Sequence, residues 1–328
     1  MTVLVPTPDN IARAADVLRA GGLVGMPTET VYGLAADALK PDAVRGIFAA
    51  KGRPADHPLI VHLPSAEHLP QWASAIPKEA IALANAFWPG PLTLILRRAP
   101  DVPDEVTGGQ DTVGLRVPGH PVALALLRAF DSGIAAPSAN RFGRISPTTA
   151  QHVLEELGDK VSVVLDGGAC EVGIESTILD LSRDTPVLLR PGAISIDAIA
   201  AVIGRRPRTQ EDGHDAAPRV SGALAAHYAP RTPLVLVPGE RLAAELAACN
   251  GRIAVLARSA APQTAFHWLT APQDPSGYAH DLYASLRTLD ALGADLILVE
   301  APPATPAWQA VADRLGRAAT GSGEADEI

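Results

Sequence analysis

The sequence predicts an α/β or α+β protein with two domains, for three reasons. Strand-like runs alternate with helical patterns over about 200 residues, a stretch rich in charge, proline and glycine begins near residue 204, and a second alternation fills 233–318. The length of 328 residues also exceeds the ~150 residues that commonly make one domain. We therefore expect a first domain at 1–203, a linker at 204–232 and a small second domain at 233–328.

Strands in the first domain are expected where short apolar runs lie between turn residues. These runs cover 23–27, 59–63, 92–96, 113–118, 134–138, 161–168 and 176–182. Helices are expected where apolar residues recur at helical spacing, at 9–20, 41–50, 78–87, 121–130 and 149–157. Gly21 and Gly22 are a natural end for the first helix, and Pro41 suits the first turn of the second. Such a mixture favours one α/β or α+β domain.

The linker and the second domain follow from a change in pattern. The segment GRRPRTQEDGHDAAPRVSG, residues 204–222, has no hydrophobic periodicity, so we expect it to be mobile. Beyond it, strand-like runs and helical patterns alternate, and this predicts a small parallel sheet with helices on its faces. The strand-like runs are 233–239, 252–258 and 294–300, and the helical patterns are 240–249, 278–292 and 306–318.

The composition is that of an ordinary globular protein, with 47% hydrophobic and 19% charged residues. A formal net charge of -9 argues against a general nucleic-acid coating protein, which would need a basic surface. The two cysteines have no metal-ligand spacing, which fits a reducing cytosol. The sequence has neither a leader-like N-terminus nor a run of ~20 apolar residues. We therefore expect a soluble, cytoplasmic protein that does not contact a membrane.

A dense basic cluster, KGRPADHPLIVHL at 51–63, contrasts with this acidic background. It holds Lys51, Arg53, His57 and His62 against a single acid. Lysine supplies a point charge and arginine a two-pronged donor, so the cluster suits a phosphate or a carboxylate. The two histidines are five residues apart, which is not the spacing of a helical zinc motif. A zinc site is therefore the weaker alternative, and a solvated basic loop is another.

Two further polar features lie beside apolar strands. Arg116 falls within the apolar run 113–118, where an internal ion pair and a buried anionic ligand fit equally well. Thr28, Glu29 and Thr30 follow an expected strand, at the end where α/β folds place ligands. The same three residues resemble a capping box at the start of a helix, and by themselves they slightly favour that interpretation.

The segment PSANRFGRISP, at 137–147, is the most informative part of the sequence. It combines small donors, two arginines and a glycine that permits a tight turn, namely Ser138, Asn140, Ser146, Arg141, Arg144 and Gly143. Such a loop can bind phosphate, although it is neither a Walker loop nor a GxGxxG loop. Ser176 and Arg190 are polar residues among apolar neighbours and are weaker candidates for the same cavity.

The sequence contains no Ser-His-Asp spacing, no paired carboxylates and no reactive-cysteine motif. The residues therefore indicate binding and positioning of anions rather than covalent catalysis.

Several of these pieces occur in one order over about 170 residues: PTETVYGLA, KGRPADHPLIVH, FWPGPLT, GLRVP, PSANRFGRISP, DGG, ESTI and LRPGAI. The set closely resembles the YrdC/Sua5 family of L-threonylcarbamoyladenylate synthases. HYAP at 227–230 and the C-terminal extension resemble the long Sua5 form. His57 stands where many members have asparagine, and Ala136 where a hydroxyl residue can sit.

The resemblance implies a fold and a reaction. The fold would be a YrdC-like twisted mixed sheet with flanking helices and a large basic cavity, followed by a small Rossmann-like domain. The reaction would convert L-threonine, bicarbonate or CO₂, and ATP with Mg²⁺ into threonylcarbamoyl-AMP and pyrophosphate. The product would pass to the tRNA threonylcarbamoyl transfer machinery, which forms t6A in tRNAs that read ANN codons. No stable binding of nucleic acid by the chain itself is implied.

The resemblance also implies roles for individual residues. The threonine contacts would be Thr30, His62, Arg116 and Ser176. The ATP contacts would be Lys51, Arg53, His57, Thr112, Ser138, Asn140, Ser146, Arg190 and Tyr228. Lys51 and Arg53 would be catalytic, because adenylation needs positioning and neutralisation of phosphoryl charge more than a strong base. Tyr228 would close over the nucleotide as the linker folds back across the cavity.

Two other function classes were weighed against this one. A module that binds tRNA or double-stranded RNA is disfavoured by the acidic net charge and the lack of aromatic stacking platforms. A regulator that binds ATP without turnover is disfavoured because the expected polar residues are all present.

Overall fold

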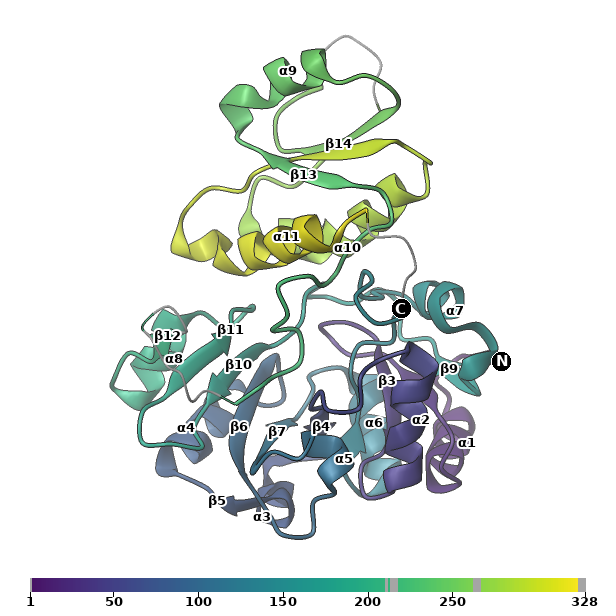
Figure 1. The fold of residues 1–328 in the computed structure, drawn as a ribbon. Helices are drawn as coiled ribbons and strands as arrows, with labels where there is room; N and C mark the ends of the chain where they lie inside the picture. Colours follow the sequence, from purple (N-terminus) through teal and green to yellow (C-terminus); the bar gives the residue numbers. More distant parts are fainter. Residues whose placement is uncertain (1, 210–211, 213–217, 262–266, 324–328) are drawn as a thin grey trace. The chain divides into compact units, whose positions relative to one another are not determined.

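The structure is a computed structural model that describes residues 2–209, 212, 218–261 and 267–323. It divides into two compact units (Figure 1). The first unit contains Met1–Arg141, Pro147–Glu171 and Glu175–Ala223; the second contains Phe142–Ser146, Val172–Ile174 and Leu224–Ile328. Two short segments of the predicted first domain, 1–203, thus belong to the second unit. In the linker expected at 204–232, residues 210–211 and 213–217 lie outside the described residues.

A mixed twelve-stranded sheet forms the centre of the first unit, as far as the structure describes it. The strand order is β1-β9-β2-β3-β8-β4-β7-β6-β10-β11-β12, and β5 pairs with β6. The bounds are β1 Thr2–Leu4, β2 Val24–Met26, β3 Gly33–Asp37, β4 Ile60–His62, β5 Ala73–Ala75, β6 Leu92–Arg98, β7 Thr112–Arg116, β8 Ile134–Ala135, β9 Val163–Leu165, β10 Thr177–Asp180, β11 Val187–Arg190 and β12 Arg208–Thr209.

Helices flank this sheet, and most begin with a signal visible in the sequence. They are α1 Pro8–Arg19, α2 Pro41–Lys51, α3 Leu69–Trp72, α4 Lys78–Phe87, α5 Asp104–Thr107, α6 Pro121–Phe130, α7 Ala150–Leu157 and α8 Ile196–Ile203. Helix α1 starts after Thr7, whose hydroxyl accepts from the N–H of Asn10. Helix α2 ends at Gly52, which takes the left-handed conformation with a φ of 64°. This stop places Lys51 in the last turn of α2, next to the basic loop.

Every strand and helix expected in the first domain has a counterpart in the structure, so those predictions are confirmed. The sequence did not predict β1, β3, β5, β11, β12, α3, α5 and α8. Strand β3 has the sequence GLAAD, and all of its residue types except leucine are depleted in strands. It forms because it pairs with β2 and β8 inside the sheet.

The two faces of this sheet have different coverings. Leu94, Leu115 and Leu179 belong to the main hydrophobic core. Because side chains alternate along a strand, the residues next to them project to the opposite face. There Ile95 and Ile178 form a smaller apolar cluster with Val220, from the segment that follows the masked residues. Part of the predicted linker therefore packs on the first unit.

The second unit is a four-stranded parallel sheet of order β13-β16-β14-β15, as far as it is described. Its strands are β13 Leu234–Val237, β14 Ile253–Ala257, β15 His267–Thr270 and β16 Leu296–Glu300, and its helices are α9 Gly239–Ala248, α10 Pro275–Asp290 and α11 Gln309–Gly321. The predicted parallel sheet is confirmed. Strand β15 was missed because only four residues with partly exposed side chains form it at the edge.

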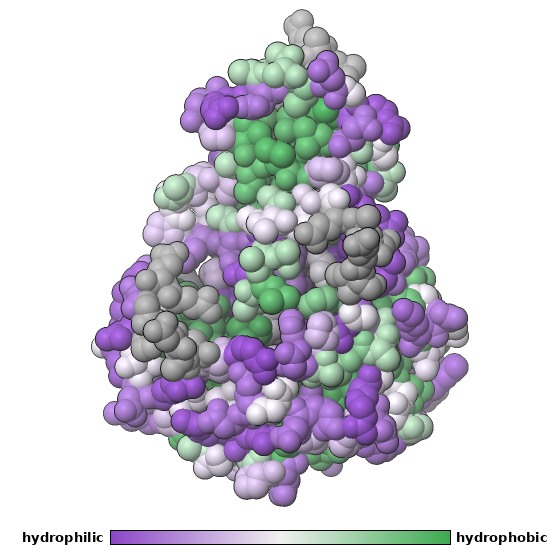
Figure 2. Space-filling view, in the orientation of Figure 1, coloured by the Kyte–Doolittle hydropathy of each residue, from purple (hydrophilic) through white to green (hydrophobic). Residues whose placement is uncertain are grey.

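The surface of the two units differs in hydropathy. In the view of Figure 2, hydrophilic residues cover most of the first unit, while hydrophobic residues gather on the second unit near β13. Strand β13 is an edge strand, and its Val235 is exposed. Among the described residues, no helix has the length and apolar character needed to cross a membrane.

Candidate active site

One face of the first sheet collects several of the predicted site residues. His62 of β4 pairs with Arg116 of β7, and Ile178 of β10 pairs with Thr93 of β6. Leu94 pairs with Leu115, so Thr93 lies opposite Arg116. Residues that face each other across neighbouring strands point to the same side of the sheet. His62, Thr93 and Arg116 therefore lie in one row on the face opposite the main core.

Arg190 reaches this face through an irregularity in β11. The pairs Leu179–Leu188 and Asp180–Val187 would place Leu189 opposite Ile178, but the register shifts and Arg190 takes that position. A β-bulge of this kind re-aims a side chain. As a result, Arg190 Nε donates to the carbonyl of Ser176 (3.0 Å), and its Nη2 donates to the Ser176 hydroxyl (3.1 Å).

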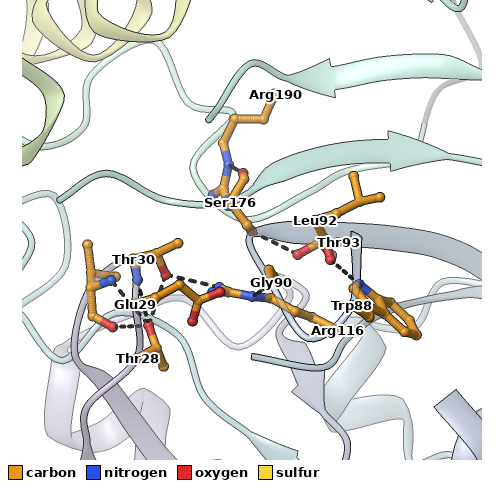
Figure 3. Close-up of polar contacts among 11 residues, drawn as sticks. Thr28, Glu29, Thr30, Trp88, Gly90, Leu92, Thr93, Arg116, Ser176 and Arg190 are labelled. Atoms are coloured by element: carbon orange, nitrogen blue, oxygen red, sulfur yellow. Dashed lines mark hydrogen bonds and ion pairs between the residues drawn. The ribbon is translucent and has the colours of Figure 1, made fainter. Parts of the chain in front are cut away.

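Arg116 lies at the end of β7 and is only 4% exposed. Figure 3 shows its contacts. Its Nε donates to the carbonyl of Gly90 (3.1 Å) and its Nη1 to the hydroxyl of Thr30 (3.0 Å), while Nη2 lies 2.5 Å from Oε1 of Glu29. The internal ion pair that the sequence left open is therefore present.

The loop of Thr28–Thr30 connects two strands. The capping-box interpretation is wrong, because the next element after β2 is β3 and no helix starts there. The Thr28 hydroxyl donates to the carbonyl of Val31 (2.6 Å). Since that donation uses its only proton, the 2.9 Å contact between the two threonine hydroxyls needs Thr30 as the donor. The Thr30 hydroxyl can therefore act toward its other neighbours only as an acceptor, and it accepts from Arg116.

A second hydroxyl pair lies at the other end of the row (Figure 3). The hydroxyls of Thr93 and Ser176 are 2.8 Å apart, and both side chains are buried. The Ser176 hydroxyl also accepts from Arg190, so this hydroxyl pair lies between Arg190 and the row. Thr93 and Glu29 are both absent from the sequence-based list of site residues.

Lys51 holds the loop that contains Ser138 and Asn140. Its Nζ donates to the carbonyl of Ser138 (2.6 Å) and to that of Asn140 (2.5 Å). Burial, helped by the nearby charge of Arg53, lowers the pKa of the Lys51 ammonium group well below its usual range. Lys51 therefore holds the backbone of the loop at 137–147 in place.

Arg53 contacts the segment at 219–221. Its Nη2 donates to the carbonyl of Pro58 (3.0 Å) and to the hydroxyl of Ser221 (3.2 Å). Arg190 Nη1 donates to the carbonyl of the same serine (2.8 Å). Two of the predicted ATP residues therefore hold Ser221, within the predicted linker.

His57 and Thr112 lie near this segment. Burial, together with the charge of Arg53, lowers the pKa of His57. Thr112 lines a small pocket that is partly open to solvent, together with residues of β4, β6 and β10 and the segment at 219–221. The cavity is mainly apolar, with Gln110 and Arg219 at its wall.

Ser146 and Tyr228 belong to the second unit. There the N–H of Ala229 donates to the carbonyl of Gly143 (2.8 Å), so the end of the 137–147 loop pairs with the HYAP segment. Tyr228 is buried and has a φ of 63°, a left-handed conformation that is uncommon for a tyrosine. The proposed ATP contacts of Ser146 and Tyr228 stay predictions.

The described residues contain no cluster of three or more His, Cys, Asp or Glu side chains that could hold a metal ion. The zinc alternative for His57 and His62 therefore lacks further ligands in the part of the chain that the structure describes. Instead, His62 lies beside Arg116 in the sheet, and burial and that neighbouring charge lower its pKa to about 3. The imidazole is therefore neutral near pH 7.

This lowered pKa predicts a loss of stability in acid. The unfolded chain binds a proton at His62 below about pH 6.5, whereas the folded chain does not until about pH 3. The free energy of unfolding should therefore fall as the pH drops through this window, by up to about 1.4 kcal/mol per pH unit from this group. In urea titrations between pH 7 and pH 4, His62→Asn should remove that part of the slope.

The exposed His267 provides the control, since His267→Asn should leave the slope as in the wild type. A constant difference in unfolding free energy between the wild type and His62→Asn at all pH values would contradict the prediction.

Comparisons with known proteins agree over nearly the whole chain. A family model described as "Telomere recombination" (Sua5_yciO_yrdC) matches residues 16–192. Another, described as "Threonylcarbamoyl-AMP synthase, C-terminal domain" (Sua5_C), matches residues 194–320.

Individual relatives cover both units. The threonylcarbamoyl-AMP synthase of Pyrococcus abyssi is 40% identical, over 97% of this chain and 98% of the relative. That of Bacillus subtilis is 41% identical, over 95% of this chain and 93% of the relative. The crystal structure of P. abyssi Sua5 complexed with L-threonine superposes with a TM-score of 0.91 at 38% identity, over 98% of each chain.

Proposed function

The chain belongs to the Sua5 family of threonylcarbamoyl-AMP synthases, and on this basis we propose how its first unit carries out the reaction. The enzyme is a nucleotidyltransferase that serves t6A modification of tRNA. We infer that it combines L-threonine, bicarbonate or CO₂, and ATP, and that it releases pyrophosphate. The observation that carries this proposal is the buried row of His62, Thr93 and Arg116, with Ser176 beside it, because it places a cation among neutral polar groups.

L-threonine occupies this row in the proposal. The guanidinium of Arg116 takes the carboxylate, and the hydroxyls of Thr30 and Ser176 hold the polar groups of the amino acid. Because the His62 imidazole is neutral, it can either accept a hydrogen bond from the threonine hydroxyl or donate one to it, without adding charge to the site. Its Nδ1 has no hydrogen-bond partner among the described residues, which leaves it available for such a contact.

ATP lies along the neighbouring cations in the proposal. Its contacts would be Lys51, Arg53, His57, Thr112, Ser138, Asn140, Ser146, Arg190 and Tyr228. Mg²⁺ would enter with ATP as part of the substrate. The linker at 204–232 would fold across the bound nucleotide.

The chemistry then requires positioning more than acid–base catalysis. Threonine first loses a proton from its ammonium group to water. The free amine then attacks CO₂: the N–C bond forms as one C=O π bond opens onto oxygen, a second N–H proton leaves to water, and a carbamate results. A carbamate oxygen attacks the α-phosphorus of ATP, and the bond to pyrophosphate breaks as the new bond forms. Arg53 and Arg190 would neutralise charge on the phosphoryl oxygens, and Lys51 would hold the loop beside them.

The test is pyrophosphate release from Mg-ATP, with threonine and bicarbonate present or omitted in turn. Release that requires both, with threonylcarbamoyl-AMP detected by mass spectrometry, is the expected result. Release without threonine would indicate a different acceptor. Tight ATP binding without release of pyrophosphate would instead favour a regulator that binds ATP without turnover. No structural observation favours that regulator or the RNA-binding module.

A further inference from the structure

The buried ion pair between Glu29 and Arg116 is the feature that carries a further inference (Figure 3). The two side chains are only 7% and 4% exposed. Neither carboxylate oxygen of Glu29 receives a hydrogen bond from a residue that the structure describes. Glu29 is therefore a buried anion with one charged neighbour and unused capacity to accept hydrogen bonds.

A site for a plain carboxylate does not explain this arrangement. Removing a carboxylate from water is costly, and one ion contact offsets that cost only in part. The negative charge of Glu29 would also oppose an incoming carboxylate at Arg116, because like charges repel strongly at short range where water is excluded. Glu29 is useful beside Arg116 when the ligand brings a positive charge as well.

An α-amino acid meets this condition, since its ammonium and carboxylate groups are attached to the same carbon atom. Building on the proposed function, we propose that Glu29 binds the ammonium group of L-threonine while Arg116 binds its carboxylate. The ion pair between Glu29 and Arg116 is then replaced by two ion pairs, one from each side chain to the bound amino acid. The Thr30 hydroxyl is a second acceptor for the ammonium group, because its proton is already donated to Thr28.

This arrangement makes Glu29 a determinant of substrate specificity. It selects amino acids over carboxylates of similar shape, because only the amino acid compensates its charge. It also holds the nitrogen atom that must later carry the carbamate, at a fixed place beside Arg116.

Calorimetric titration of the full chain with two ligands tests the proposal. The probes are L-threonine and (R)-3-hydroxybutyrate, which keeps the carboxylate and hydroxyl groups but has hydrogen in place of the ammonium group. The wild type should bind threonine more tightly by on the order of 30-fold. In Glu29→Gln this preference should largely disappear, because threonine binds more weakly while 3-hydroxybutyrate binds as well as before or better.

If Glu29 only holds Arg116 in place, the variant will weaken both ligands by the same factor, and the proposal is overturned. Unchanged threonine affinity in Glu29→Gln would overturn it as well. Glu29→Asp provides a second variant in case the amide does not fold, and it should keep the preference for threonine because it keeps the charge. Pyrophosphate release by the wild type tests the proposed function separately, so failure of one is not failure of the other.

Discussion

Replacing Arg116 by methionine should reduce threonine-dependent pyrophosphate release by at least about 100-fold. The same change should lower the free energy of unfolding by about 3–5 kcal/mol, because it leaves the Glu29 carboxylate buried without its counter-charge. It also removes the donors to the carbonyl of Gly90 and the hydroxyl of Thr30. Pyrophosphate release and urea unfolding measure the two effects.

A double variant separates these effects. Combining Glu29→Gln with Arg116→Met should recover much of the lost stability, since no uncompensated charge remains, but it should not recover turnover. The exposed pair of Arg97 and Asp111 offers a matched control on the same sheet, and Arg97→Met should cost at most about 1 kcal/mol. If Arg116→Met is as stable as the Arg97→Met control, loss of the buried Glu29–Arg116 ion pair does not destabilise the fold and the prediction is wrong.

Replacing Lys51 by methionine should lower turnover by about 100-fold or more and leave the protein folded. The carbonyls of Ser138 and Asn140 would lose their common donor, so the loop that faces the proposed phosphate site would no longer be held. Arg53→Ala should have an effect of similar size, since it removes a cation from the same region. Single-turnover formation of threonylcarbamoyl-AMP is the measurement, with threonine binding by calorimetry expected to stay close to the wild type.

Lys160 provides the matched control for Lys51. Its Nζ also donates to a backbone carbonyl, that of Ala50, but it lies at the surface in a segment outside the proposed site. Lys160→Met should therefore retain normal turnover. Normal adenylation by Lys51→Met or by Arg53→Ala would rule out their proposed catalytic role.

The short-range features of the fold could be predicted because their causes are local. Pro41 and Gly52 set the bounds of α2, and the short apolar runs at 92–96 and 113–118 identify two central strands. Because side chains alternate along a strand, Thr112 and Arg116 share one face of β7. The strand of sequence GLAAD could not be predicted in this way, since only its two neighbours in the sheet make it a strand.

The candidate site could be predicted from the sequence only in part. Ordered motifs indicate cationic and hydroxyl residues as candidates, and the structure brings four of these candidates, His62, Arg116, Ser176 and Arg190, to one face of one sheet. The sequence around Glu29 slightly favours a helix cap over a ligand contact, because nothing near it suggests a buried arginine as its partner.

The sequence by itself determined the family, the main helices and strands, and the chemical nature of the site, because residue types, spacing and order are properties of the chain. Only the tertiary structure decided which side chains meet. The pairing of β4 with β7 and of β6 with β10 brings distant residues into one row, and a register shift in β11 turns Arg190 toward it. Glu29, the ion-pair partner of Arg116, comes from a loop far away in sequence. The two charges pair because both are buried, and a buried charge without a counter-charge is costly.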